Sequence, residues 1–485
     1  MSLGRQIRSG VIWSSLGNVG GQAIFALVFF VLARLLDPKD FGLIAYAAVF
    51  ASFFAVFLKL GYKDALVQIE DLQPGHLATV FWASAAIGVA LAGLCALAAV
   101  PIAYVTGEPR LIPVIQALSV SSAIGGFNVV PLALLQRDFQ FKAIANRTLL
   151  ANVVGGAAGV AAAWQGLGVW ALVIQRLLTE LVALVLGWAA VDYRPIASFS
   201  FASLKQLSHY SNRVFGVNLV NYADQYIDQL LIGSTLNQVQ LGYYAIGRRI
   251  SLMLSTTLLD PCRAVTFPMF SKIQSDAERA RRALYDGTRM VTTLTYPLFL
   301  GLAVLSPEAV AVAVGEKYGP VVELVWAFSL LGFYSSTMIM FIGVCKGMGK
   351  PAYILYQRLI SVALNVALFA VVVRYGIFWV AIAFALRAFA TSPLQLWFMR
   401  KAAGIAYGAF IRALVAPLAI AAISVGCGFA VRLAAEPHLG PLLRLVVSFA
   451  AILLVHAALV RLVMPGTIQQ LKQLMARRPA STTDA

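Results

Sequence analysis

The chain has 485 residues, of which 60% are hydrophobic and only 12% are charged, and its formal net charge is +17. Soluble domains carry about 25% charged residues, so this composition excludes a soluble globular protein and indicates a multi-pass membrane protein. The excess of Lys and Arg predicts basic loops on the cytoplasmic side of a membrane. It does not indicate nucleic-acid binding, because no basic patch with interleaved aromatic residues lies outside the apolar segments.

A membrane-spanning helix needs about 20 apolar residues, and on this rule the sequence predicts an all-α protein with about 14 such helices. They lie near residues 11–35, 41–62, 77–101, 112–135, 143–164, 167–190, 210–233, 242–265, 288–314, 320–345, 352–373, 376–399, 411–432 and 442–463. With the N-terminus in the cytoplasm, most of the 37 Lys and Arg residues fall on the cytoplasmic side. An even number of spans then places the C-terminus there too.

Two kinds of residue predict local features within these spans. Pro261, Pro297 and Pro393 predict kinks in the eighth, ninth and twelfth spans. Three glycines in the fifth span predict the close approach of a neighbouring helix: Gly155, Gly156 and Gly159. The four cysteines and four histidines show no disulfide or metal spacing, so we expect no metal site and no cofactor.

The chain also contains an internal repeat. Residues 1–60 align without a gap on residues 201–260, so that Asn18 meets Asn218 and Gly42 meets Gly242. Spans 1 and 7 then both run outward, which predicts two parallel, pseudo-symmetric six-helix bundles. The expected boundaries are 1–200 and 201–400, followed by two additional helices and a cytoplasmic tail in 401–485. Two bundles around a central cleft are an alternating-access architecture.

Two aspartates lie four residues apart on one face of the seventh span. Charged residues inside a membrane are costly, so each is a candidate for function. At 1.5 Å per residue, Asp228 lies about 9 Å from the outer end of its span, at the same depth as Arg248 and Arg249 of the next span. Two interpretations remain open for Asp228: a neutralising ion pair with one of these arginines, or a role in ion coupling or gating.

The second aspartate, Asp224, lies one turn deeper, and its sequence neighbours suggest no partner at that depth. Asn221 and Asn218 continue its face at spacings of three, and Asn18 is the repeat counterpart of Asn218. This polar stripe is typical of a water-filled cavity with a proton or sodium site, and equally of a ladder of hydrogen bonds between helices. On the first interpretation, Asp224 couples transport to an H⁺ or Na⁺ gradient.

Two arginines lie near the middle of equivalent spans, about 15 Å deep. Arg176 has Glu180 one turn further on, so either an ion pair along the helix or a cavity role can explain it. Arg387 has no acidic residue within four positions, which favours a cavity role. Because the guanidinium group presents a forked set of donors, both residues are candidates for contacting phosphate in a substrate cavity.

Several segments resemble the polysaccharide transporter family, the Wzx-type flippases of the multidrug/oligosaccharidyl-lipid/polysaccharide superfamily. They are "LARLLDPKDFGLIAYA" (32–47), "ALLQRDFQFK" (133–142), "GLGVWALV" (166–173), "LGYYAIGRRI" (241–250) and "FPMFSKIQSD" (267–276). The resemblance spans roughly residues 1–400 and is closest to exporters of colanic acid and exopolysaccharides. It implies a MATE-like fold and the movement of oligosaccharides linked to undecaprenyl diphosphate across the bacterial inner membrane. A polysaccharide polymerase and chain-length proteins are the partners that it implies. Contacts with anionic phospholipids are expected from the basic loop residues Arg279, Arg281 and Arg282.

Three other classes of function compete with a flippase. A MATE-like, ion-coupled exporter of small cationic drugs would need an acidic cavity, against which Arg176 and Arg387 argue. A membrane-bound glycosyltransferase usually needs a large outer loop with acidic residues, and the predicted outer loops are short, so we expect no enzyme. A non-transporting component of a polysaccharide assembly complex remains open.

Overall fold

The protein is helical throughout the part that the structure describes. The computed structural model describes the backbone of residues 3–58, 62–69 and 71–466, and the side chains of these residues except 3–12, 14–16, 202–215 and 217. No strand occurs within these residues, which confirms the predicted all-α fold. The predicted cytoplasmic tail beyond residue 466 lies outside the described residues.

Two compact units divide the chain. One contains Met1–Ile246 and Val362–Val380, and the other contains Gly247–Ser361 and Ala381–Ala485. Three helices continue from one unit into the other, namely α10 (Gln238–Lys272), α15 (Ala352–Val372) and α16 (Ile377–Ala390). The bundle boundaries expected at residues 200 and 400 stay a prediction.

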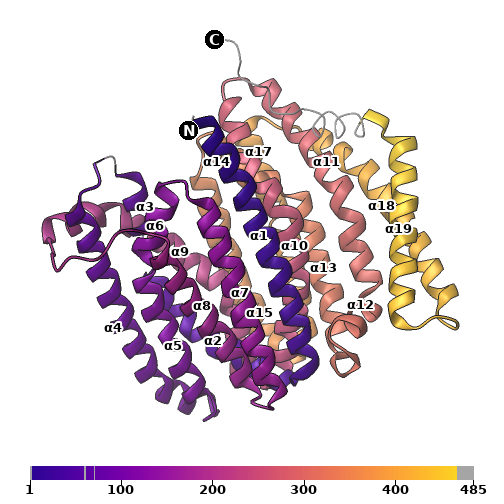
Figure 1. Cartoon of the computed structure of the whole chain (residues 1–485). Helices are drawn as coiled ribbons and strands as arrows, with labels where there is room; N and C mark the ends of the chain where they lie inside the picture. Colours follow the sequence, from indigo (N-terminus) through magenta and orange to yellow (C-terminus); the bar gives the residue numbers. More distant parts are fainter. Residues whose placement is uncertain (1–2, 59–61, 70, 467–485) are drawn as a thin grey trace. The chain divides into compact units, whose positions relative to one another are not determined.

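The first unit contains most of the N-terminal half (Figure 1). Its own helices are α1 (Leu3–Leu35), α2 (Pro38–Leu58), α3 (Tyr62–Gln68), α4 (Pro74–Thr106), α5 (Leu111–Phe127), α6 (Val129–Arg137), α7 (Phe141–Trp164), α8 (Val169–Ala189), α9 (Phe201–Thr235) and the short η2 (Val373–Tyr375). Within it α4 packs on α5, and α7 packs on both α1 and α8.

The glycines of α7 make that packing close. A Cβ atom on Gly155 would overlap the hydroxyl of Thr179 and lie 2.8 Å from the carbonyl oxygen of Gln175, both on α8. One on Gly156 would lie 2.5 Å from Val28 of α1. The predicted close approach is confirmed.

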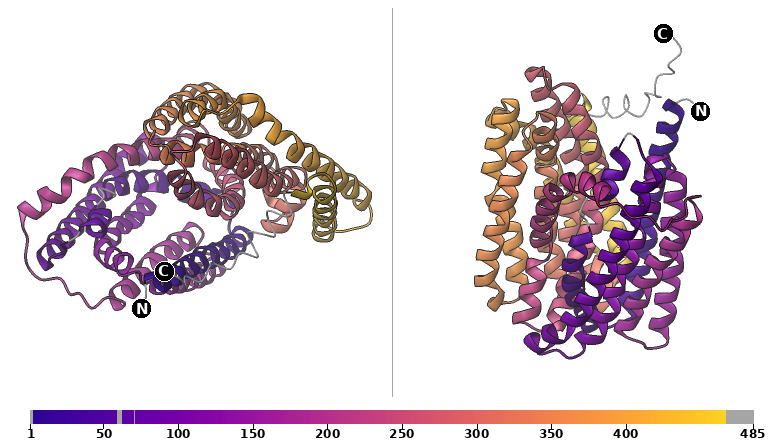
Figure 2. Two further views of the ribbon diagram at one scale, coloured as in Figure 1. Left: turned by 90° about the horizontal axis from the view of Figure 1, so that it is seen from above. Right: turned by 90° about the vertical axis from the view of Figure 1, so that its left-hand side faces the viewer.

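The second unit contains the remaining helices. They are α11 (Ala277–Val304), α12 (Ser306–Ala313), η1 (Glu316–Tyr318), α13 (Val321–Thr337), α14 (Met340–Gly347), α17 (Ser392–Ala403), α18 (Tyr407–Ala435) and α19 (Pro441–Val463). Helix α11 packs on α13 and α18, and α18 and α19 form a hairpin whose two helices lie side by side (Figures 1 and 2). Buried residues such as Phe270, Phe299 and Phe410 form an apolar cluster in this unit.

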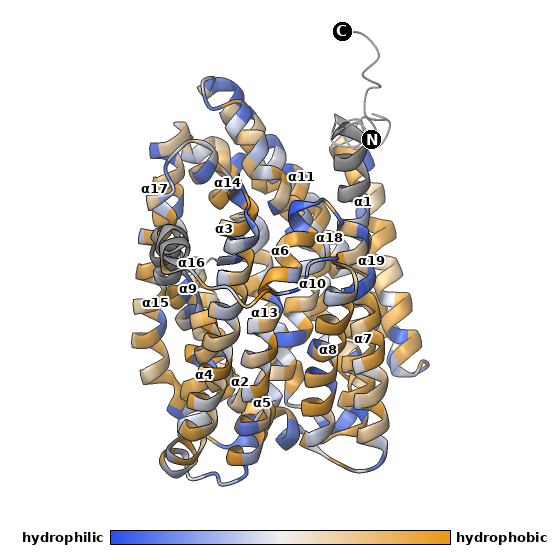
Figure 3. Ribbon diagram, turned by 60° about the vertical axis from the view of Figure 1, so that its left-hand side comes forward, coloured by the Kyte–Doolittle hydropathy of each residue, from blue (hydrophilic) through white to orange (hydrophobic). Residues whose placement is uncertain are grey.

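All 14 predicted spans fall on helices, as far as the chain is described. Among the described residues, nine segments are long and apolar enough to cross a membrane, and two bent helix pairs, α5–α6 and α11–α12, raise this number to 11. The other three predicted spans coincide with α7, α9 and α10, which contain 24, 35 and 35 residues. Figure 3 shows hydrophobic residues along α7 and α8 and hydrophilic residues in the loops at their ends. The protein is therefore a multi-pass membrane protein.

The ninth predicted span contains a sharp bend beyond its proline. Helix α11 continues through Pro297, and the chain turns by 77° only after Val304, where α12 begins. The sharp bend thus lies about two turns beyond the proline. Pro307 in the first turn of α12 fits this position, because the first turn of a helix needs no N–H donor from it.

Candidate functional site

Helix α9 is held against α2 by two tyrosines one turn apart. The hydroxyl of Tyr222 donates to the carbonyl of Val49 at 2.9 Å, and Ser52 donates to the hydroxyl of Tyr226 at 3.2 Å. Because these tyrosines occupy one face of α9, the two aspartates of the same segment are offset around the helix from the face that meets α2.

Asp224 has a partner that the sequence did not reveal. Its Oδ1 accepts a hydrogen bond of 3.0 Å from the side-chain amide of Asn365, on α15. Asn365 is fully buried, and no group in the described part of the chain donates to its Oδ1. A carboxylate and a buried amide oxygen are thus brought together in a place where both can accept from, or coordinate, a small cation.

Asp228 is fully buried and is also anchored by a residue that sequence reasoning missed. The hydroxyl of Tyr244, itself fully buried, donates to Oδ2 of Asp228 at 2.6 Å, and the backbone N–H of Gln229 donates to Oδ1 at 2.9 Å. Tyr244 lies on α10 one turn before Arg248, so the predicted contact between the two helices exists through a tyrosine. The ion pair of Asp228 with Arg248 or Arg249 stays a prediction.

The asparagines of the predicted polar stripe occupy different environments. Asn218 and Asn221 are half-buried on α9, whereas Asn18 is exposed on α1. Their assignment to a substrate cavity stays a prediction.

Arg176 forms the ion pair that its spacing predicts. Its Nε lies 3.2 Å from Oε1 of Glu180, and the two side chains are 37% and 31% exposed. The pair leaves the guanidinium group accessible and partly neutralised.

Arg387 and Arg248 meet at one aromatic ring in the second unit. The Cζ atom of Arg387 lies 4.8 Å from the centroid of Phe384, and that of Arg248 lies 5.4 Å from the same centroid. Phe384 and Arg387 are buried, and Arg248 is half-buried. The sequence did not predict that Arg248 and Arg387 share a contact with one ring. Two guanidinium groups near one ring offer a set of donors suited to an anion with several oxygens.

Arg249, the neighbour of Arg248 on α10, is also half-buried. Its predicted part in gating stays a prediction.

The internal repeat is visible as a reciprocal contact. A Cβ atom on Gly42 of α2 would overlap the carbonyl oxygen of Gln238, and one on Gly242 of α10 would overlap the carbonyl oxygen of Pro38. Residues 38 and 42 correspond to 238 and 242 in the ungapped repeat, so equivalent atoms meet in both directions. Such exchange is the signature of a twofold relation between two copies of a motif. This contact agrees with the alignment of the two repeats at these residues, and the alignment stays a prediction.

Comparison with solved structures places this fold among known transporters. The chain is similar to the lipid II flippase MurJ in an inward closed conformation, with a TM-score of 0.69 and 12% identity over 93% of this chain and 99% of that one. It is also similar to an inward-facing multidrug resistance transporter of the MATE family, with a TM-score of 0.63 and 15% identity over 79% and 95% of the two chains. At these identities the likeness shows a MurJ- and MATE-like fold, as the sequence predicts.

The chain is similar to curated proteins named for polysaccharide biosynthesis. It is 27% identical to the succinoglycan biosynthesis transport protein ExoT of Rhizobium meliloti (strain 1021), over 73% of this chain and 72% of that protein. It is 25% identical to the lipopolysaccharide biosynthesis protein WzxC of Escherichia coli (strain K12), over 69% of each. It is 23% identical to the teichuronic acid biosynthesis protein TuaB of Bacillus subtilis (strain 168), over 93% of this chain and 94% of that protein.

These relatives agree with the resemblance seen in the sequence motifs. The family described as "Polysaccharide biosynthesis protein" matches residues 31–323, more than half of the chain. The chain therefore belongs to the family "Polysaccharide biosynthesis protein".

Proposed function

We propose that this protein moves oligosaccharide repeat units, linked to undecaprenyl diphosphate, across the bacterial inner membrane for exopolysaccharide or lipopolysaccharide biosynthesis. Both termini then lie in the cytoplasm. The similarity to ExoT and WzxC, which are named for succinoglycan and lipopolysaccharide biosynthesis, supports a role in polysaccharide biosynthesis. The similarity of the fold to the lipid II flippase MurJ supports a lipid-linked cargo. The observation that carries the proposal is the pair of guanidinium groups of Arg248 and Arg387 at the Phe384 ring.

The chemistry of this pair favours an anionic head group. Each guanidinium can donate two parallel hydrogen bonds to phosphate oxygens, and a diphosphate offers enough oxygens for both. A cationic drug would meet two like charges in a partly buried place, where Coulomb repulsion is poorly screened. The pair therefore favours a lipid diphosphate over the small cations expected for a multidrug exporter.

Transport by alternating access is supported by the repeat. The reciprocal contact of Gly42 with Gly242 joins equivalent ends of two helices that belong to different copies of the repeat. A contact of this kind can close one side of a transporter and must open when the other side closes.

The direct test is transport by the purified full-length protein in proteoliposomes. A lipid-linked oligosaccharide with a fluorescent label is incorporated, and its arrival in the opposite leaflet is measured as digestion by an added glycosidase. We expect translocation of the diphosphate-linked lipid and much slower translocation of the same sugar on an uncharged lipid. Translocation no faster than in protein-free liposomes would contradict the proposal and favour a non-transporting component.

We further propose that the Asp224–Asn365 pair binds the coupling ion, H⁺ or Na⁺. The pair combines a half-buried carboxylate with a buried amide oxygen that has no donor among the residues that the structure describes. A site of this kind attracts a small cation, because both groups present oxygen lone pairs in a place of low dielectric constant.

The corresponding prediction concerns the dependence of transport on an imposed gradient. Asp224→Asn removes the negative charge while keeping the shape, so we expect transport that no longer responds to H⁺ or Na⁺ gradients. The rate is measured in proteoliposomes over a range of each gradient. Asp260→Asn is the matched control, because Asp260 is an exposed aspartate of α10 paired with Arg263 at 2.8 Å. An unchanged gradient response in Asp224→Asn would eliminate Asp224 as the coupling site.

A further inference from the structure

The two C-terminal helices make polar contacts with the bent pair α11–α12. The hairpin α18–α19 lies along α11, and α19 also contacts α12. In the sequence these helices appear only as an addition to two bundles of six. The contacts between them and α11–α12 occur at three levels, all within the second unit.

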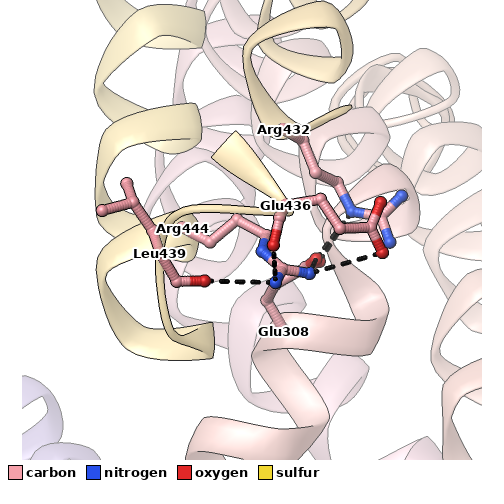
Figure 4. Close-up of polar contacts among 5 residues, drawn as sticks. All are labelled: Glu308, Arg432, Glu436, Leu439 and Arg444. Atoms are coloured by element: carbon pink, nitrogen blue, oxygen red, sulfur yellow. Dashed lines mark hydrogen bonds and ion pairs between the residues drawn. The ribbon is translucent and has the colours of Figure 1, made fainter. Parts of the chain in front are cut away.

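Glu308 is the centre of the first level (Figure 4). It lies in the first turn of α12, directly after the 77° bend, and its side chain is only 2% exposed. Nε of Arg432, near the end of α18, lies 2.7 Å and 2.9 Å from its two carboxylate oxygens. Nη1 of Arg444, near the start of α19, lies 3.4 Å from Oε1. One buried carboxylate thus holds both helices of the hairpin.

Arg444 also fixes the loop that joins those helices. Its Nη2 donates to the carbonyl oxygens of Glu436 at 3.0 Å and Leu439 at 3.1 Å. The carboxylate of Glu436, which is 54% exposed, lies 3.7 Å from Nη1. An arginine that satisfies two carbonyls and a carboxylate has few alternative positions, so the loop is held in one geometry.

His456 forms the second level, where it contacts a backbone carbonyl of α11 that lacks its helical hydrogen bond. In a regular helix the N–H of residue 297 would donate to the carbonyl of Thr293, but Pro297 has no N–H. Nε2 of His456, on α19, lies 2.8 Å from that carbonyl oxygen. A carbonyl can only accept, so Nε2 carries the proton and donates. His456 is 9% exposed, and its Nδ1 lies 3.4 Å from the hydroxyl of Ser424 on α18.

An apolar contact lies between these two levels. Ile452 of α19 packs on Gly301 of α11, where a Cβ atom would lie 3.3 Å from its Cδ1, and on Gly428 of α18, where a Cβ atom would overlap its Cγ1. The three levels follow one antiparallel register, because positions 293, 301 and 308 of α11–α12 face 456, 452 and 444 of α19.

We infer that His456 replaces the backbone donor that Pro297 cannot supply, and that with Glu308 it fixes the α18–α19 hairpin on the bent α11–α12 pair as one structural body. The hairpin is then a required part of the second unit. This inference does not depend on the proposed cargo.

The first test is a double-mutant cycle between His456 and Pro297. The variant His456→Leu leaves the Thr293 carbonyl without a donor, and we expect the unfolding equilibrium constant to rise roughly three- to tenfold, the range for such bonds in membrane proteins. The variant Pro297→Ala restores an N–H for that carbonyl. In the Pro297→Ala background, His456→Leu should therefore cost much less, as measured by urea or heat unfolding of the detergent-solubilised full-length protein.

Glutamine provides the conservative variant at position 456. Its side-chain amide can donate to the Thr293 carbonyl, so His456→Gln should keep most of the stability that His456→Leu loses. Equal losses from His456→Leu in the wild-type chain and in the Pro297→Ala background would overturn the donor role, even if each single variant folds.

The second test separates Glu308 from other carboxylates of the hairpin. Glu308→Gln should raise the unfolding equilibrium constant more than tenfold, because it leaves two arginines facing a neutral group. The matched control Glu436→Gln, which removes an exposed partner of Arg444, should change it less than threefold. Combining Glu308→Gln with Arg432→Gln should cost less than the two single changes together. Two outcomes would contradict the role of Glu308 in fixing the hairpin. One is full additivity of Glu308→Gln and Arg432→Gln, and the other is an equal loss of stability from Glu308→Gln and Glu436→Gln.

Discussion

The Arg387→Ala variant is expected to lose transport of the diphosphate-linked oligosaccharide, whereas Arg387→Lys keeps part of it. Alanine removes a buried guanidinium that lies 4.8 Å from the Phe384 centroid beside Arg248. Hydrogen bonds to charged groups contribute about 1.5–3 kcal/mol each, so losing a forked pair should lower the transport rate by roughly a hundredfold or more. Lysine keeps the charge but donates as a point charge, so it cannot replace the forked contact.

Two measurements check this expectation. Export is measured by complementation in a strain that lacks the gene, and translocation is measured in proteoliposomes at matched protein abundance. Arg374→Ala is the control, since Arg374 is an exposed arginine of the short η2 helix. We expect this control to transport normally. Normal transport by Arg387→Ala, at normal abundance, would show that the cationic pair does not contact the cargo.

Gly42→Ala and Gly242→Ala are each expected to prevent the close contact of α2 with α10, and to do so to the same extent. In each case the new methyl group would overlap a backbone carbonyl oxygen, of Gln238 or of Pro38. Backbone atoms within helices cannot rotate away as a flexible side chain can, so the helix ends must separate. The energetic cost of such overpacking is about 1–3 kcal/mol, which corresponds to roughly a fivefold to hundredfold shift between conformations.

The expected result for transport follows from the proposed alternating-access cycle. If the glycine contact closes one side, both variants populate the opposite state and slow the cycle. A cysteine placed at the outer end of α2 should then react faster with a membrane-impermeant thiol reagent in both variants. Gly408→Ala is the control, because no atom lies within 4 Å of the added Cβ. A large effect of one substitution with none from its counterpart would argue against the twofold relation.

The local features of the fold could be predicted from the sequence because they depend on short-range chemistry. Runs of apolar residues predict the helices of all 14 spans, and the four-residue spacing of Arg176 and Glu180 predicts their ion pair. The alignment of Gly42 with Gly242 could be made from matching hydropathy alone. In the structure these two glycines lie at one close contact between α2 and α10. The kink predicted at Pro297 stays a prediction, whereas the 77° bend after Val304 and the contact of His456 with the Thr293 carbonyl had no counterpart in the sequence pattern.

The partners of the buried polar groups could not be predicted, since they come from distant parts of the chain. Asn365 reaches Asp224 across 141 positions, and Arg432 reaches Glu308 across 124. Nothing in the sequence around Glu308 marks it as a buried centre, except that an acid lies within a predicted span.

The sequence by itself determined an all-helical membrane protein, its repeat and its family, because hydropathy and local spacing act along the chain. Only the tertiary structure decided which polar groups meet. A buried charge or carbonyl must find a partner in three dimensions, and many residues of the right type compete for that place. The choice of Phe384 as the meeting point of Arg248 and Arg387, and of His456 for the Thr293 carbonyl, was therefore settled by packing.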